Sequence, residues 1–275
     1  MATLNLPGWE NLFIIVCLLE KKVVLSNLNR VFGQILSLQE IISLAQGFYT
    51  HVARSLKETF LTRLISLEKH KDKVMIKGEQ HILDLVFSGE FKGAMLITGH
   101  FGSWEFAPVV GISHFPQYRG QFYFVRKVLS FKWLEKILFK NYNQAGLKVI
   151  PKKNSLNKVC DALENYGVVI FVIDQHASLG TKDGIKVDFF GEPSGTYKSP
   201  AIIARYTKVP VFPVRSYRQQ DGRHVLEFFP QIPWISSDDE KEEILINTRQ
   251  YNQWIEKFII DYPDQWLWFH KRWKV

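Results

Sequence analysis

Hydrophobic residues follow two different periods along this chain. In the N-terminal part they recur at helical spacing, and Pro7 is the only proline before Pro108. The clearest helical run comprises Ile35, Leu36, Leu38, Ile41, Ile42, Leu44 and Ala45. Because apolar side chains at this spacing line one face of a helix, residues 1–70 are predicted to form a helical segment.

From residue 71 onward, short apolar runs alternate with amphipathic stretches. Strands are predicted at residues 94–98, 121–125, 148–150, 168–173, 209–214 and 225–229, and helices at residues 78–88, 131–145, 155–166, 199–207 and 240–262. This alternation predicts an α/β domain over residues 71–275, with a central mixed, largely parallel sheet and helices on both faces.

Composition narrows the class of protein. The chain has 275 residues, of which 46% are hydrophobic, so it can bury a large core and is too apolar for disorder. Its net charge of +8 favours partners that carry phosphate, although a dispersed basic surface would give the same charge. Cys17 and Cys160 lie in apolar patterns, which predicts buried, reduced thiols.

A membrane-spanning helix is not predicted. The longest apolar run covers residues 12–19, whereas spanning a bilayer takes about 20 residues. Glu10 precedes the run and Lys21 and Lys22 follow it, which is the reverse of a secretory signal. The run is compatible with an interfacial anchor and equally with an ordinary packed helix.

The segment Leu-Ile-Thr-Gly-His-Phe-Gly-Ser-Trp-Glu carries the first candidate chemistry, in His100 and Glu105. Five residues on one helix turn about 500°, so the two side chains can meet only if His100 lies in a turn and Glu105 in the first turn of the next helix. Gly99 and Gly102 permit such a turn, and Ser103 is a plausible N-cap. An imidazole beside a carboxylate can take a proton from an alcohol. A capped helix start with a surface histidine is the simpler alternative.

Two further strand ends carry polar groups. The run at residues 169–173 ends in Asp174 and Gln175, and ligands gather at the carboxyl ends of strands in open α/β sheets. Asp174 is therefore expected to face the same cleft as His100, although a turn and hairpin with capping residues would look the same. Arg126 follows another strand, where its guanidinium could clamp a phosphate or an oxyanion.

The C-terminal residues 266–274 combine tryptophans with basic residues. This mixture suits a membrane interface, single-stranded nucleic acid, or a tail packed into the core. The chain contains neither a His-Glu-x-x-His zinc pattern nor a phosphate-binding loop of the Gly-x-x-x-x-Gly-Lys-Ser/Thr type. Chemistry without a metal or cofactor is therefore favoured.

Taken in order, these segments resemble the bacterial lipid A biosynthesis acyltransferases, the late lauroyl and myristoyl transferases. Residues 100–105 are similar to the family's His-Phe-Gly-Asn-Trp-Glu core, with Ser103 in place of asparagine. Asp174 and Gln175, followed by residues 187–191, resemble its second block, and residues 266–274 resemble its closing signature. The resemblance covers residues 25–275.

The resemblance implies a glycerol-phosphate-acyltransferase-like fold and transfer of a fatty acyl chain from acyl carrier protein to a hydroxyl of a phosphorylated glycolipid, a lipid A precursor. His100 would be the general base, and Glu105 would hold its tautomer. The oxyanion would be met by backbone amides around Gly102 and Ser103, or by Arg126. Asp174 and the loop at residues 180–186 would shape the mouth of the site, and Gln175 is a further expected substrate-binding residue.

The expected location is the cytoplasmic face of the bacterial inner membrane, where the protein would be peripheral or weakly anchored on anionic lipid. No cofactor and no nucleic acid are expected. Two rivals remain: an acyltransferase that uses a glycerol phosphate or a mannoside lipid as acceptor, and a non-catalytic basic protein of the membrane surface.

Overall fold

A computed structural model describes residues 20–274, apart from residues 65, 87, 88, 90, 128–138 and 141. Its centre is a seven-stranded sheet with the order β1-β9-β8-β2-β5-β3-β4, in which only the β8–β9 pair is antiparallel. The strands are β1 (Val74–Lys77), β2 (Ala94–Thr98), β3 (Phe122–Arg126), β4 (Leu147–Pro151), β5 (Val168–Val172), β8 (Val211–Arg218) and β9 (His224–Phe228). The predicted mixed, largely parallel sheet is confirmed.

Every predicted strand is present, with boundaries that differ by a few residues, but three strands were not predicted. β1 is only four residues long and lies at the sheet edge. β6 (Gly184–Phe189) and β7 (Glu192–Tyr197) form a separate antiparallel hairpin. The sequence of β7, Glu-Pro-Ser-Gly-Thr-Tyr, has no apolar run, which is why the pattern does not predict it.

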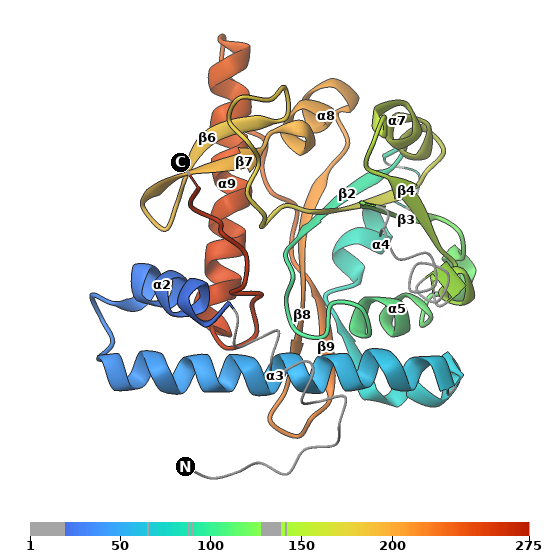
Figure 1. The fold of residues 1–275 in the computed structure, drawn as a ribbon. Helices are drawn as coiled ribbons and strands as arrows, with labels where there is room; N and C mark the ends of the chain where they lie inside the picture. The colour runs from blue at the N-terminus through green and yellow to red at the C-terminus, as the bar shows by residue number, and fades with distance from the viewer. Residues whose placement is uncertain are drawn as a thin grey trace.

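Helices cover both faces of the sheet, as predicted (Figure 1). They are α2 (Lys21–Phe32), α3 (Leu38–Leu64), α4 (Gln80–Val86), α5 (Ala107–Ile112), α7 (Leu156–Glu164), α8 (Ser199–Thr207) and α9 (Glu240–Asp261). Short 3-10 helices occur at Leu67–Lys73 and Pro116–Tyr118. The helix predicted at residues 131–145 lies mostly outside the described residues.

The strand period places alternate side chains of β2 in two different cores. Met95 and Ile97 join the core beneath α2, α3, α8 and α9, whereas Ala94 and Leu96 join the core beneath α4 and α5. All four side chains are at most 2% exposed. A strand buried on both faces is the arrangement expected at the centre of a largely parallel sheet.

The N-terminal helices and the C-terminal tail pack into the first of these cores. Val24 and Leu28 on α2 and Phe48 on α3 are fully buried, and Trp266 and Trp268 are at most 1% exposed. Of the three interpretations left open for the tail, packing into the core is therefore the one that the structure shows.

Two sequence-based expectations concern the apolar run near the N-terminus and the two cysteines. The apolar run at residues 12–19 and Cys17 lie outside the described residues, and Cys160 is partly exposed rather than buried. Among the helices that the structure describes, none has both the length and the apolar character needed to cross a bilayer.

Candidate active site

The turn after β2 places His100 at the carboxyl end of the sheet. Gly102 has a φ of +56°, and a Cβ there would lie 2.6 Å from the carbonyl oxygen of Ser216. Only glycine fits this close approach to β8. The sequence predicts a short or kinked helix after this turn, because Pro108 would be awkward inside a long one. α5 begins at Ala107 and is six residues long, with Pro108 in its first turn.

Two details of this turn differ from the prediction. Phe106, not Ser103, occupies the N-cap position of α5, and it makes no side-chain capping bond. Glu105 lies in the turn before α5 rather than in its first helical turn. The backbone amides of Phe106 and Ala107 instead bind the carbonyl of Ser103.

Asp174 is the carboxylate that contacts the imidazole of His100. β2 and β5 are adjacent and parallel, with Thr98 paired to Val172, so the residues that follow them meet. His100 Nδ1 lies 2.9 Å from Asp174 Oδ1, and the His100 amide donates to Asp174 Oδ2 at 2.7 Å. The indole Nε1 of Trp266 donates to the same Oδ2 at 2.8 Å. These bonds fix the carboxylate, which is 2% exposed.

Burial and charge act in opposite directions on this pair. Burial alone lowers the pKa of His100, but the charge of Asp174 and the hydrogen bond to it outweigh burial and raise that pKa above its ordinary value. Burial alone would raise the pKa of Asp174, but the interactions with His100 and Trp266 lower it to about 2. Asp174 is therefore ionised at neutral pH and stabilises a protonated imidazole.

Glu105 has a different partner from the one expected. The hydroxyl of Tyr142 donates to a carboxylate oxygen of Glu105. Because a ring nitrogen makes one strong hydrogen bond, Asp174 occupies the position at Nδ1 that was expected for Glu105. Glu105 still acts on His100 through its charge, which contributes less than Asp174 to raising the pKa of His100.

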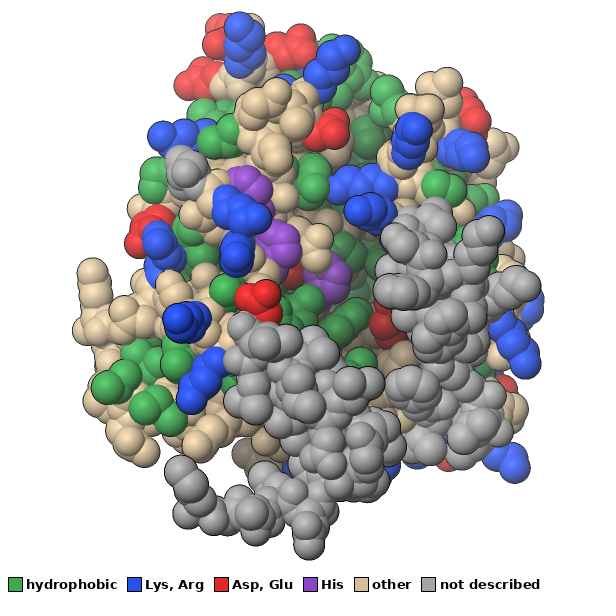
Figure 2. All heavy atoms as spheres, viewed as in Figure 1, with side chains coloured by type: hydrophobic (Ala, Val, Ile, Leu, Met, Phe, Trp, Pro, Cys, Tyr) green, Lys and Arg blue, Asp and Glu red, His purple; other side chains and the backbone are tan. Residues whose placement is uncertain are grey.

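A cavity of about 540 Å³ opens beside His100. Its mouth is polar and its interior apolar; the interior is lined by Leu96, Val109, Ile112, Phe122, Phe124, Leu147, Ile170, Val214, Leu226 and Phe228. These residues come from α5 and from one face of the strands β2, β3, β4, β5, β8 and β9. The volume is typical of pockets for small ligands. Figure 2 shows histidine side chains beside this hollow and lysines and arginines on the same face.

The other predicted site residues divide into two groups. Gln175 and Arg126 line the cavity, and the guanidinium carbon of Arg126 lies 5.7 Å from the ring centre of Tyr142. Gly102 and Ser103 are buried outside it, and the amide of Gly102 already donates to the carbonyl of Gln265 at 2.9 Å. The Gly102 amide is therefore unavailable to an oxyanion, which corrects that expectation.

His176 and His270 were not predicted as site residues, but both line the cavity with His100. The His176 amide lies 3.4 Å from His270 Nδ1 and donates to it, which leaves the ring proton of a neutral His270 on Nε2. Burial lowers the pKa of His270 to about 4. The ring is then uncharged at neutral pH and offers an N–H donor. The sequence signal that could have identified His270 is its place in the C-terminal signature at residues 266–274.

Within the described part of the chain, no group of three or more His, Cys, Asp or Glu side chains could hold a metal ion. The arrangement instead provides a base, a buried carboxylate that orients it, and an apolar cavity at its side. These groups suit removal of a proton from a hydroxyl next to a lipid chain.

Comparison with known protein sequences gives three findings. The sequence model of a protein family, described as bacterial lipid A biosynthesis acyltransferase, matches residues 15–275. A phosphatidylinositol mannoside acyltransferase of Mycolicibacterium smegmatis is 22% identical over 80% of this chain and 69% of its own length. The protein of the same name from Mycobacterium tuberculosis is 26% identical over 62% of this chain and 52% of its own length.

The chain is also distantly similar to a solved structure. It is the 1-acyl-sn-glycerophosphate (LPA) acyltransferase PlsC from Thermotoga maritima, with a TM-score of 0.38 and 13% sequence identity. The match covers 80% of this chain and 96% of that one. This likeness is too low to carry a conclusion about the site.

Proposed function

The chain belongs to the bacterial lipid A biosynthesis acyltransferase family, and from this premise we propose that it transfers a fatty acyl chain from acyl carrier protein to a hydroxyl of a lipid A precursor or related glycolipid. The observation that carries the proposal is the 2.9 Å contact between His100 and the buried Asp174 at the mouth of an apolar cavity.

His100 acts as the general base in this proposal. Asp174 accepts a hydrogen bond from the N–H at Nδ1, so the lone pair lies on Nε2 and can take the proton of the acceptor hydroxyl. The resulting alkoxide attacks the thioester carbonyl, and the carbon–sulfur bond breaks as the tetrahedral intermediate collapses. The leaving thiolate takes the proton back from the imidazolium, so no acyl-enzyme is formed and no proton is left over.

Four groups would assist this step. The ionised Asp174 stabilises the imidazolium, and Glu105 adds a second, weaker negative charge. Arg126, at the mouth of the cavity, is the proposed donor to the oxyanion, because a preorganised charged donor is worth most where the negative charge develops. The neutral His270 is placed to donate to an acceptor oxygen.

The apolar interior of the cavity is the proposed site of the acyl tail. Each methylene buried there contributes about 0.8 kcal/mol to binding. α5, which contributes Val109 and Ile112 to the wall of the cavity, follows the turn of His100. The base and part of the proposed tail site therefore belong to one continuous segment of the chain.

Basic residues at the mouth fit the proposed partners. Arg126, Lys127 and Lys152 line this end of the cavity. Their charge suits both an acidic carrier protein and the phosphates of a glycolipid, and would speed their encounter with the enzyme. Peripheral attachment to the cytoplasmic face of the inner membrane is supported by two exposed apolar side chains. Ile35, between α2 and α3, is 75% exposed, and Leu38, the first residue of α3, is 71% exposed.

A mannoside lipid is the second candidate acceptor, because both curated relatives are named phosphatidylinositol mannoside acyltransferases. The deciding experiment uses three separate reactions, each with the purified protein and a radiolabelled acyl carrier thioester. The acceptors are a lipid A precursor in the first reaction, a phosphatidylinositol mannoside in the second and a lysophosphatidic acid in the third.

Mass spectrometry of the products then identifies the acylated lipid. We expect the lipid A precursor to gain one acyl chain and the His100→Ala variant to form this product roughly 10²–10⁴-fold more slowly. If only the mannoside is acylated, the mannoside lipid takes the place of the lipid A precursor as the proposed acceptor. The absence of transfer to any of the three lipids would overturn it.

A further inference from the structure

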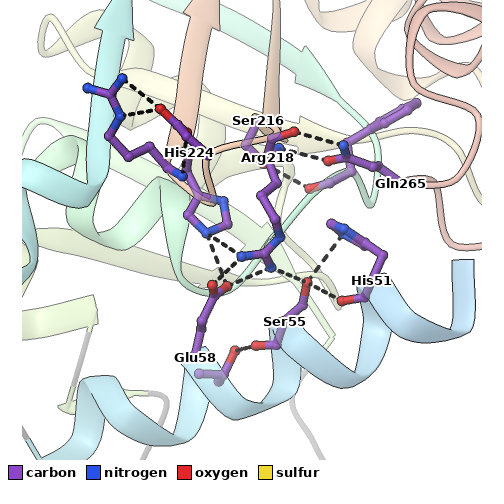
Figure 3. Close-up of polar contacts among 11 residues, drawn as sticks. His51, Ser55, Glu58, Ser216, Arg218, His224 and Gln265 are labelled. Carbon is purple, nitrogen blue, oxygen red and sulfur yellow. Dashed lines mark hydrogen bonds and ion pairs between the residues drawn. The ribbon is translucent and has the colours of Figure 1, made fainter. Parts of the chain in front are cut away.

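A second polar cluster lies where α3 crosses the ends of β8 and β9 (Figure 3). α3 contributes His51, Ser55 and Glu58, whose spacing places them on one face of the helix. His51 and Ser55 are at most 5% exposed. Nearer the start of α3 the buried side chains are all apolar: Ile41, Ala45 and Phe48. The buried face of α3 therefore changes from apolar to polar where it meets β8.

Arg218 is the centre of this cluster. Its guanidinium binds both carboxylate oxygens of Glu58, one of them at 2.9 Å, and lies 3.4 Å from the hydroxyl of Ser55. His224 Nε2 approaches the same carboxylate at 3.1 Å. The Arg218 side chain is 8% exposed. Burial alone would raise the pKa of Glu58, but His224 and Arg218 lower it to about 2, so the carboxylate stays ionised.

Gln265 connects Arg218 to the turn that carries His100. Its side chain pairs with the backbone of Arg218 on both sides, accepting from the amide at 2.7 Å and donating to the carbonyl at 2.9 Å. Its own carbonyl accepts the amide of Gly102 at 2.9 Å. Gln265 is 7% exposed. A displacement of β8 at Arg218 would therefore be passed to the backbone two residues after His100.

Other bonds join the same turn to β8 and α3. The hydroxyl of Ser216 donates to the carbonyl of Phe101 at 2.8 Å. The backbone of Gly102 interacts with the ring of His51, whose pKa burial lowers to about 4. The amide of Leu267 donates to the carbonyl of His100 at 3.1 Å. The backbone of the catalytic turn is thus held from three separate parts of the chain.

The chemistry of the cluster suits positioning better than simple stabilisation. Removing two charges from water costs as much as their attraction returns, so a buried ion pair adds little to stability compared with apolar packing. A two-pronged Arg–carboxylate contact, however, is satisfied in only one geometry. A base displaced by about 1 Å can lose roughly 10²-fold in rate.

We infer that Arg218, held by Glu58 of α3, is a positioning residue that fixes the end of β8 and, through Gln265 and Ser216, the turn that carries His100. This inference rests on the proposed acyl transfer, in which His100 must meet the acceptor hydroxyl at a defined place. It assigns to α3 a role in catalysis although none of the cluster except Ser216 lines the cavity.

The test is the Arg218→Met variant, which keeps most of the apolar stem and loses both contacts to Glu58. We expect kcat for acyl transfer to fall about 10- to 100-fold while KM for the thioester changes less than about twofold, at a temperature well below thermal unfolding. Glu58→Gln should show a milder loss of the same kind. Because the two side chains act as one unit, the double variant should be no slower than Arg218→Met alone.

Arg223→Met is the matched control. Arg223 belongs to the same β8–β9 hairpin and pairs with Asp221 at 2.7 Å, but both side chains are about half exposed. Its kcat should equal that of the wild type. If Arg218→Met and Glu58→Gln lower only the unfolding temperature and keep wild-type kcat, the cluster is merely structural and the inference is wrong.

A second readout does not depend on turnover. Nuclear magnetic resonance of histidine-labelled protein follows the titration of His100 directly. In Arg218→Met, or in Glu58→Gln if the former does not fold, the pKa of His100 should fall toward its ordinary value as the contact with Asp174 loosens. An unchanged pKa would contradict the inference. If the wild-type protein transfers no acyl chain, the proposed function is refuted. The titration of His100 then still decides whether Arg218 and Glu58 position that residue.

Discussion

At the scale of single residues, the site depends on His100 and on the side chain that orients it. The sequence identifies the histidine, because an imidazole between two glycines after a buried strand is an unusual pattern. It does not identify the orienting carboxylate. Glu105 is five positions away, whereas Asp174 is 74 positions away and is brought close by the pairing of β2 with β5.

Replacement of the base tests the mechanism most directly. His100→Ala should lower the rate of acyl transfer by roughly 10²–10⁴-fold, the usual scale of general-base catalysis, while far-UV circular dichroism stays that of the wild type. Gln175→Ala, at another residue that lines the cavity, is the comparison for loss of side-chain volume at the mouth. Normal turnover in His100→Ala would remove this residue from the chemistry.

Asp174→Asn should change both the rate and its pH dependence. The wild-type reaction needs neutral imidazole, so its rate rises with pH through the pKa of His100, which Asp174 raises. Without that charge the pKa falls, and the acidic limb of the pH–rate profile should move to lower pH. The maximal rate should also fall, by about 10²–10⁴-fold, because the amide of asparagine favours the tautomer that carries its proton on Nε2.

Glu105→Gln provides the comparison for this prediction. Its charge is the smaller of the two carboxylate contributions to the pKa of His100, so the acidic limb should move less than in Asp174→Asn. Steady-state rates measured between pH 5 and pH 9, the range in which perturbed histidines titrate, give both profiles. A larger displacement in Glu105→Gln would identify Glu105 as the principal partner of His100.

At the scale of elements, local sequence explains where helices and strands begin. α9 is the clearest case: Asp239 caps it by accepting the amide of Lys241 at 2.9 Å, and Glu240, Glu242 and Glu243 lie in its first turn. A cap and acidic residues at the positive end of the helix dipole are both encoded within a few positions. By contrast, the buried polar residues of α3 find their partners on β8, which is distant in the sequence. Periodicity alone therefore does not reveal that this face of α3 is buried.

The capping of α9 gives a prediction at this scale. Asp239→Ala should reduce the free energy of unfolding by about 0.5–2 kcal/mol, because one amide at the start of the helix loses its acceptor. Urea denaturation measures the change. Asp238→Ala, one position outside the helix, should stay within about 0.5 kcal/mol of the wild type. Equal effects in the two variants would show that Asp239 contributes only its charge.

At the scale of the whole molecule, the C-terminal tail holds the N-terminal helices and the site together. The ring centre of Trp268 lies 6.0 Å from that of Phe32 on α2 and 4.7 Å from that of Trp266. The indole N–H of Trp266 donates to Asp174. The side chain of Asn27 on α2 donates to the carbonyl of Trp268 at 2.9 Å. Residues from both ends of the chain therefore support the carboxylate that orients His100.

This arrangement makes the tail part of the core. Trp268 is fully buried, and Trp268→Ala should lower the free energy of unfolding by about 3–5 kcal/mol because the cavity left behind cannot collapse completely. Ile260→Ala, at a site that is 60% exposed, should change it by less than about 0.5 kcal/mol. Guanidinium denaturation distinguishes the two, and a loss below about 1 kcal/mol for Trp268→Ala would mean that the tail is not part of the core.

The sequence by itself determined the features that depend on near neighbours: the strand and helix periods, the glycine turn at His100, the short α5 and the acidic start of α9. Tertiary structure alone decided which strands pair, and so brought Asp174 rather than Glu105 to the Nδ1 of His100. It also decided that the terminal tryptophans are core and that Gln265 and Arg218 brace the turn. The reason is physical: periodicity reports which face of an element is buried, but not which distant element covers that face.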